Sequence, residues 1–257
     1  MKIIDAHLHC FSGKIPDFSN YGDHELVAGV IMDTGYAEML SLVPERAVFC
    51  RGLKSGTVTR ESTPSLLADF DKALSGPRCV GIKLYCGYES AYPADSRHFP
   101  FLDILMKHGK TLVIHGGETA GGHGLLKYSH PLAVDELAHL YPDLNIVIAH
   151  YGTPWIVDAT AVAAKNKRVH IDLSGLVEGE FNPDEFYAKN HAFYNYLKMW
   201  MEYLGDYDKF LFGTDWPLVN PAAYIDLIRK IIPESEQEKV FFRNSVRVFG
   251  LDKYINM

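Results

Sequence analysis

Short apolar runs alternate along the chain with stretches of helical periodicity. The runs are apolar at successive positions, which is typical of strands buried on both faces of a parallel sheet. We predict strands over Ile3–Ala6, Ala47–Cys50, Val80–Leu84, Thr111–Ile114, Asn145–Ala149, Val169–Leu173 and Phe210–Phe212, with a weaker eighth near Met39–Val43. Apolar residues at helical spacing predict helices over Ser65–Leu74, Pro131–Tyr141, Asp158–Lys165 and Asn220–Ile232. The segment Asp17–Asp33 has no clear assignment.

Strands that alternate with helices predict parallel strands joined by helical crossovers. Seven or eight such units in 257 residues favour a closed barrel over an open sheet. An open doubly wound sheet would place a glycine-rich phosphate loop after its first strand, where this chain has His7-Leu8-His9. We therefore predict an α/β chain forming one (β/α)8 barrel, the TIM-barrel fold, over residues 1–257.

Composition narrows the class of protein. The net charge is −7 and no run of lysine or arginine forms a basic stripe, so we expect no nucleic-acid partner. No window approaches the roughly 20 apolar residues of a spanning helix, and Asp5 and two histidines interrupt the apolar N-terminus, so we expect no membrane partner and a cytoplasmic location. The four cysteines are scattered and never spaced as Cys-x-x-Cys, which predicts reduced core residues: Cys10, Cys50, Cys79 and Cys86.

Ionisable residues gather at the ends of the predicted strands. They are His7 and His9, Lys83 within its strand, and His115, His150 and Asp215. In a barrel the carboxyl ends of all strands open onto one face, where active sites form. We expect these residues to converge there although they are far apart in sequence.

His7 and His9 are two positions apart, so both side chains can point inward and hold one ion. Neutral imidazoles with a carboxylate suit zinc, manganese or Fe(II) and leave a position for water. A divalent ion lowers the pKa of such a water toward ~7. We therefore predict a divalent metal, zinc first, and the residues allow either one ion or two.

Several other residues keep two interpretations. His150 is either a ligand of a second ion or an unligated acid–base group, and Lys83 either serves the metal site or neutralises a buried carboxylate. Arg51, Tyr85 and Glu118 follow strands and are candidates for substrate binding, with a solvated rim position as the alternative. The expected partner is a small molecule, and aromatic residues over Phe186–Tyr203 belong either to a homo-oligomer interface or to the core.

The ordered set of strand ends resembles the amidohydrolase superfamily, specifically its amidohydrolase-related branch of barrel metal-dependent hydrolases. The resemblance spans nearly the whole chain through Ile4–His9, Gly81–Leu84, Val113–Glu118, Val147–Gly152, Leu211–Pro217 and Arg243–Leu251. It implies that His7, His9, His115 and Asp215 are the metal ligands and that His150 transfers a proton or polarises the substrate. The resemblance favours one metal, with two as the alternative. Family members with two metals use a carboxylated lysine, for which Lys83 lies near the right strand.

The resemblance implies a hydrolase of small lactones, esters or amides, in which Asp215 accepts a proton from the metal-activated water and His150 assists the leaving group. The same branch contains non-oxidative decarboxylases, which are the main alternative, and Arg51 is a natural carboxylate anchor in either case. A non-catalytic metal-binding barrel and a two-metal phosphoester hydrolase are further alternatives. Fold and metal do not identify the substrate.

Overall fold

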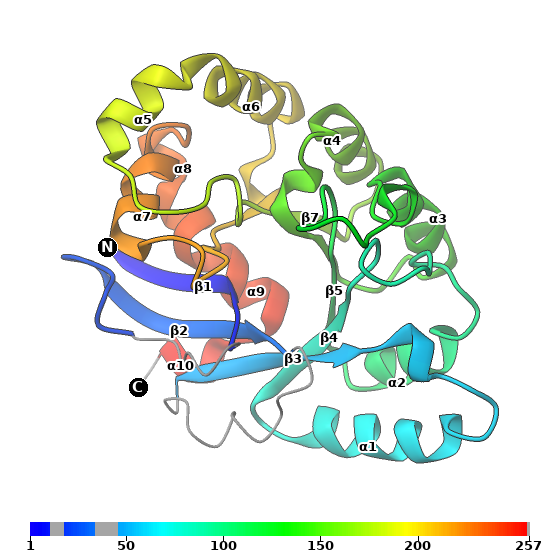
Figure 1. The fold of residues 1–257 in the computed structure, drawn as a ribbon. Helices are drawn as coiled ribbons and strands as arrows, with labels where there is room; N and C mark the ends of the chain where they lie inside the picture. The colour runs from blue at the N-terminus through cyan, green and yellow to red at the C-terminus, as the bar shows by residue number, and fades with distance from the viewer. Residues whose placement is uncertain (11–17, 34–45, 256–257) are drawn as a thin grey trace.

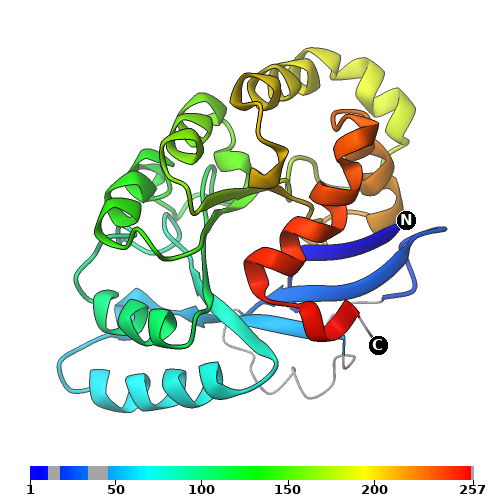
Figure 2. The same ribbon diagram turned by 180° about the vertical axis from the view of Figure 1, so that it is seen from behind.

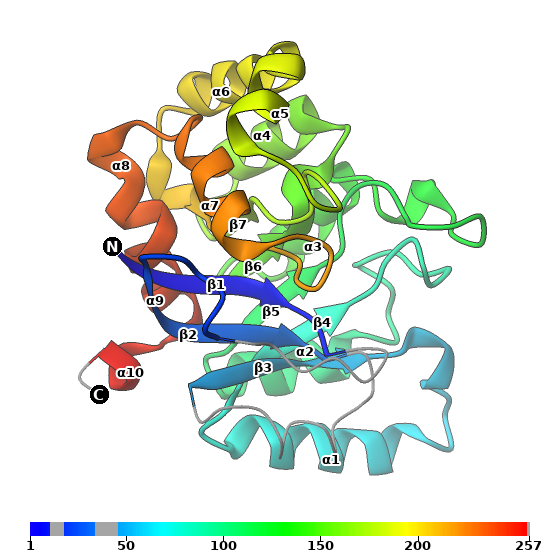
Figure 3. The same ribbon diagram turned by 60° about the vertical axis from the view of Figure 1, so that its left-hand side comes forward.

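Eight strands form one sheet in the computed structural model, which describes residues 1–10, 18–33 and 46–255. They neighbour one another in sequence order, and each adjacent pair from β1 to β8 is parallel. Figure 3 shows the arrowheads of the first strands pointing to the same side. The strands are β1 Lys2–Leu8, β2 Glu25–Met32, β3 Ala47–Leu53, β4 Cys79–Leu84, β5 Thr111–Ile114, β6 Ile146–Ile148, β7 Val169–Asp172 and β8 Phe210–Leu211.

The segment after β8 closes the sheet against β1. The Ala6 amide donates to the Phe212 carbonyl at 2.9 Å, and the Asp215 amide donates to the His7 carbonyl at 2.9 Å. The predicted (β/α)8 barrel is therefore confirmed, with the last strand continued by a hydrogen-bonded loop.

Helices cover the outside of the barrel (Figure 1). Asn220 shows how the sequence sets a helix start: its side chain accepts from the Ala223 amide at 3.2 Å, and Pro221 takes the first helical position. The helices are α1 Thr63–Ser75, α2 Phe99–Lys107, α3 Leu132–Leu140, α4 Ile156–Lys165, α5 Pro183–Lys189, α6 His191–Leu204, α7 Pro221–Arg229, α8 Glu234–Glu238, α9 Asn244–Phe249 and α10 Asp252–Ile255. The four predicted helices correspond to α1, α3, α4 and α7.

Apolar side chains fill the barrel interior from its amino-terminal end. Interior residues such as Val48 and Val147 form one cluster with Phe242, Val246 and Phe249, which come from the C-terminal helical segment. Figure 2 shows this segment, with α9, lying across the barrel. This packing closes the barrel interior at its amino-terminal end, and the interior opens at the carboxyl ends of the strands.

The second strand is where the sequence prediction needs correction. It is β2, within the segment left unassigned, and the strand predicted near Met39–Val43 lies outside the described residues. A glycine inside a strand weakens the sequence signal. Gly29 is needed there because a Cβ atom would lie 2.5 Å from Leu8 Cδ1.

The structure confirms the expectation for the cysteines, which are all free and buried. Among the helices of the described residues, none has the length and apolar character needed to cross a membrane.

Candidate active site

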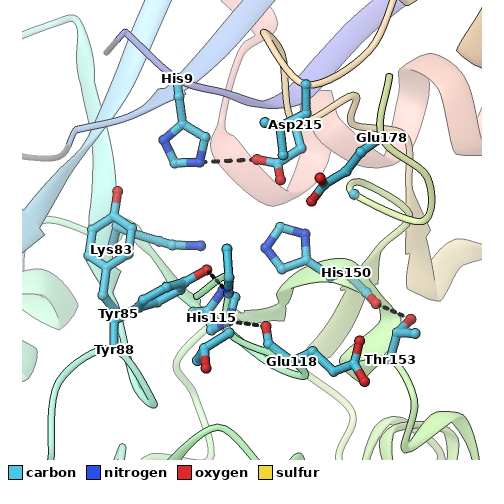
Figure 4. Close-up of a pocket in the computed structure, with 14 residues that line it drawn as sticks. His9, Lys83, Tyr85, Tyr88, His115, Glu118, His150, Thr153, Glu178 and Asp215 are labelled. Carbon is cyan, nitrogen blue, oxygen red and sulfur yellow. Dashed lines mark hydrogen bonds and ion pairs between the residues drawn. The ribbon is translucent and has the colours of Figure 1, made fainter. Parts of the chain in front are cut away.

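The predicted residues do converge at the carboxyl end of the barrel, around a cavity of about 540 Å³ (Figure 4). The cavity is lined by five of the six strand-end residues, His9, Lys83, His115, His150 and Asp215. His7 is fully buried, with its ring centroid 4.8 Å from that of His150.

Three side chains form a compact donor set. Asp215 Oδ1 lies 3.1 Å from His9 Nε2 and 3.6 Å from His7 Nε2. One ligand atom from each residue lies within 4.8 Å of those from the other two. The structure therefore brings together three of the four predicted ligands, from the first and last strands of the barrel.

Hydrogen bonds turn both imidazoles toward this point. His7 Nδ1 contacts Asp172 Oδ2 at 2.8 Å, and His9 Nδ1 contacts the Met32 carbonyl at 3.2 Å. A partner on one ring nitrogen fixes which nitrogen is free to bind a metal. His7 Nε2 is buried and has no hydrogen-bond partner in the part of the chain that the structure describes. The imidazoles of His7 and His9 and the carboxylate of Asp215 fit a divalent ion, and the unpartnered His7 Nε2 is one of these donor atoms.

Burial keeps His7, His115 and His150 neutral. It lowers the pKa of His7 to about 3, with Lys83 adding to the effect, and it lowers the pKa of His115 and of His150. Burial alone would raise the pKa of Asp215, but the neighbouring histidines outweigh it and hold that pKa well below its usual range. Neutral imidazoles and an ionised carboxylate are the forms that bind metal ions.

Asp172, which the sequence analysis missed, organises the histidines. Besides His7, it accepts hydrogen bonds from the His150 amide at 3.0 Å and from the Ser174 amide and hydroxyl. Ser174 Oγ in turn contacts His150 Nδ1 at 2.9 Å, which leaves His150 Nε2 for a substrate. The signal for Asp172 was its place as the only acidic residue in an apolar strand, next to that strand's carboxyl end.

A second missed carboxylate, Asp5, anchors the loop that carries Asp215. Asp5 accepts hydrogen bonds from the Thr214 hydroxyl at 2.6 Å, the Thr214 amide at 3.0 Å and the Tyr21 hydroxyl at 2.7 Å. Burial raises its pKa to about 6, while these hydrogen bonds act in the opposite direction. Asp5 thereby ties β1 to the residue before Asp215.

Two site residues have left-handed backbone conformations. The φ angle is 59° at His150 and 62° at Asp215. Residues other than glycine adopt such a backbone conformation at a cost of about 1–3 kcal/mol. Gly175 allows both side chains to sit together, because a Cβ atom there would lie 2.8 Å from His150 Nδ1 and 3.1 Å from Asp215 Oδ2.

We expect Gly175→Ala to lower kcat/KM by about tenfold or more, since the new methyl group displaces the His150 and Asp215 side chains and φ is +63° at this position. Steady-state kinetics would measure the loss. Gly109→Ala is the matched control, because it has a similar φ of +61° and open space around the new Cβ atom. Equal activity of the two variants would contradict this role for Gly175.

The remaining predicted residues divide into two groups. His115 lies beside the donor set but outside it: its Nε2 contacts the Glu118 carbonyl at 3.0 Å, and its ring centroid is 5.0 Å from that of His150. Tyr85 and Glu118 line the cavity, which is consistent in position with substrate contacts. Lys83 is fully buried, and burial lowers its pKa to about 8 against the opposing charges of Asp172 and Asp215.

Arg51 is not brought to the cavity. Its guanidinium lies 5.0 Å from the centroid of the Phe70 ring on α1, outside the barrel. The neighbouring Cys50 packs in the barrel interior, and successive strand residues face opposite sides. The expectation that Arg51 anchors a substrate is therefore corrected. Residues that the sequence analysis did not single out also line the cavity, among them Tyr88, Thr153 and Glu178.

Comparison with known proteins gives one family. A family model described as Amidohydrolase matches residues 42–251, which includes His115, His150 and Asp215 and begins after β2. No curated protein sequence matches the chain.

Solved structures share the fold over nearly the whole chain. A TIM-barrel protein of Bordetella bronchiseptica is 16% identical with a TM-score of 0.72, covering 97% of this chain and 99% of its own. A probable 2-pyrone-4,6-dicarboxylic acid hydrolase of Acinetobacter baumannii is 19% identical with a TM-score of 0.65, covering 97% and 100%. A 2,6-dihydroxybenzoate decarboxylase from Rhizobium is 16% identical with a TM-score of 0.67, covering 98% of each chain.

These similarities agree with the site geometry. The solved structures support the barrel, and the family match extends over most of the 257 residues. The solved structures of similar fold include a protein described as a probable hydrolase and one described as a decarboxylase. The chain belongs to the amidohydrolase family.

Proposed function

We propose that this chain is a metal-dependent hydrolase that cleaves a small lactone, ester or amide. The observation that carries the proposal is the meeting of His7 Nε2, His9 Nε2 and Asp215 Oδ1 beside a cavity large enough for a small molecule. We propose zinc as the resident ion, with manganese or Fe(II) compatible with the same donors. When bound, a divalent ion polarises a carbonyl oxygen and lowers the pKa of a water molecule.

The side chains of the chain itself move the protons. Asp215 Oδ2 accepts a proton from the attacking water, and His150 Nε2, which is unprotonated in the neutral ring, takes this proton over and donates it to the leaving oxygen or nitrogen. The acyl bond to the leaving group breaks, and the acyl carbon gains the hydroxyl of the water. The products are a carboxylic acid and an alcohol or amine. Ser174 and Asp172 hold the other side of the His150 ring, which keeps Nε2 directed at the leaving group.

His115 is proposed as a further ligand, as the family resemblance implies. Its Nε2 would exchange the hydrogen bond to the Glu118 carbonyl for the ion. We propose one ion rather than two, because His150 Nδ1 already contacts Ser174 and because Asp172 is engaged by His7, His150 and Ser174. A carboxylated Lys83 that bridges two ions, with His150 as a ligand, is the alternative, and it would favour phosphoester cleavage.

Hydrolysis is better supported than decarboxylation of a carboxylated ring. The arginine expected to anchor a substrate carboxylate, Arg51, lies outside the barrel. Among the described residues that line the cavity, Lys83 is the only lysine or arginine. A non-catalytic metal-binding barrel is less supported because the donor set borders an open cavity.

Metal content tests the proposal directly. In protein purified without chelator or an affinity metal, we expect about one equivalent of zinc or manganese per chain by inductively coupled plasma mass spectrometry. Removing the ion should abolish ester or lactone hydrolysis, and restoring it should recover the activity. About two equivalents would instead support Lys83 and His150 as ligands. No metal after incubation with divalent ions would refute the metal-dependent function, and metal without turnover would support the non-catalytic barrel.

A further inference from the structure

The cavity carries its charges in two layers. Lys83 is fully buried, and Asp215 is almost so, whereas Glu118 and Glu178 are exposed. Figure 4 shows the side chains of Glu118 and Glu178 on the same side of the cavity as His150. The charge near the donor set and the charge at the exposed wall therefore act on different parts of a bound molecule.

The buried layer has little positive charge to offer a distant substrate group. The opposite charges of Asp172 and Asp215 both act on Lys83. With a divalent ion bound, the ion and Lys83 would bring three positive charges against these two carboxylates, and the one that remains would lie beside the scissile carbonyl. An anionic group elsewhere on the substrate would find no other lysine or arginine on the described part of the cavity wall.

The exposed layer is acidic and aromatic. Neither Glu118 nor Glu178 forms an ion pair with any residue in the described ranges. Tyr88 and Tyr85 also line the cavity, on the side opposite the two glutamates (Figure 4), and the Tyr88 ring centroid lies 4.7 Å from that of His115. Carboxylates attract a protonated amine by charge pairing, and tyrosine rings across the cavity can add a cation–π attraction.

We propose that the substrate of this site carries a protonated amine at the end remote from its scissile carbonyl, bound by Glu118 and Glu178. The inference rests on the hydrolase function proposed above and adds the substrate class. The donor set would bind the scissile carbonyl, and the two glutamates would bind the protonated amine at the other end of the substrate. An unpaired carboxylate in a partly enclosed cavity also repels an anionic substrate, so selection works through both attraction and repulsion.

Three methyl esters of equal length test the selectivity: those of aminocaproic, hydroxycaproic and adipic acid, the last as the monoester. We expect kcat/KM for the amine ester to exceed that for the hydroxyl ester by about tenfold and that for the carboxylate ester by about a hundredfold. The preference should shrink as salt is added. Equal or faster cleavage of the carboxylate ester would overturn the inference while leaving the hydrolase function standing.

The double variant Glu118→Gln, Glu178→Gln should bring the ratio between the amine and hydroxyl esters close to one. Glu180→Gln is the matched control, because Glu180 is exposed two positions away and does not line the cavity. An unchanged ratio in the double variant would overturn the inference.

If none of the three esters is cleaved, that result counts against the proposed hydrolase function alone. Binding measurements then still test the inference about the amine. The corresponding methyl ketones with amine, hydroxyl and carboxylate ends would be titrated by calorimetry. Tighter binding of the amine ketone supports the inference, and equal or tighter binding of the carboxylate ketone overturns it.

Discussion

His9→Ala is expected to remove the metal and to lower kcat/KM by about a thousandfold or more. His9 Nε2 is one of three donor atoms that meet at the site, and it lies 3.1 Å from Asp215 Oδ1. Loss of this imidazole leaves His7, Asp215 and the proposed further ligand His115, which lies outside the compact donor set, so we expect the ion to be held far more weakly. Metal analysis after gel filtration measures the occupancy, and ester hydrolysis measures the rate.

The choice of His9 limits the damage to the fold. His7 is fully buried and bonded to Asp172, so its removal would also take away the histidine partner of the buried Asp172 Oδ2, whereas His9 is 9% exposed. His139→Ala is the matched control, because His139 is exposed in the last turn of α3, far from the strand ends. A His9→Ala protein that keeps its full metal content would refute the donor set.

His150→Asn is expected to keep the metal and to lower kcat by about a hundredfold to ten-thousandfold. His150 supplies Nε2 for the leaving group, while Ser174 and Asp172 hold its Nδ1 and backbone amide. Asparagine is polar and similar in size, but it cannot donate a proton as an acid. KM should change less than kcat, since the loss falls on the chemical step.

The metal content of the same variant separates the two interpretations of His150. One equivalent retained with turnover lost supports an acid–base role. Parallel loss of metal and activity would make His150 a ligand and favour the alternative with two ions. His139→Asn controls for the chemical change at an exposed helix position.

The position of a residue along the chain was enough to predict most of the site. Apolar runs predicted seven of the eight strands. Polar residues that follow the carboxyl end of a buried strand lie at the open face of the barrel. His9, His150 and Asp215 therefore reach one cavity for a reason already visible in the sequence. His7 joins them from the end of the first strand.

The direction of a side chain was harder to predict. Arg51 and Cys50 are neighbours, yet one faces α1 and the other the barrel interior. The pairing of β3 with β4 shifts between Phe49 and Cys50, and a shift of one residue reverses which side chains face inward. The expectation that Arg51 binds a carboxylate rested on its residue type and its place after a strand, and neither of these shows the direction of its side chain.

The sequence by itself determined the barrel, its open end and the histidine-rich chemistry at that end, because these follow from local patterns repeated along the chain. Only the tertiary structure decided how the parts meet: Asp172 orienting His7 and His150, Arg51 lying outside, and Glu178 reaching the cavity wall. Hydrogen bonds between strands far apart in sequence, and the register of each strand against the next, depend on the closed barrel as a whole.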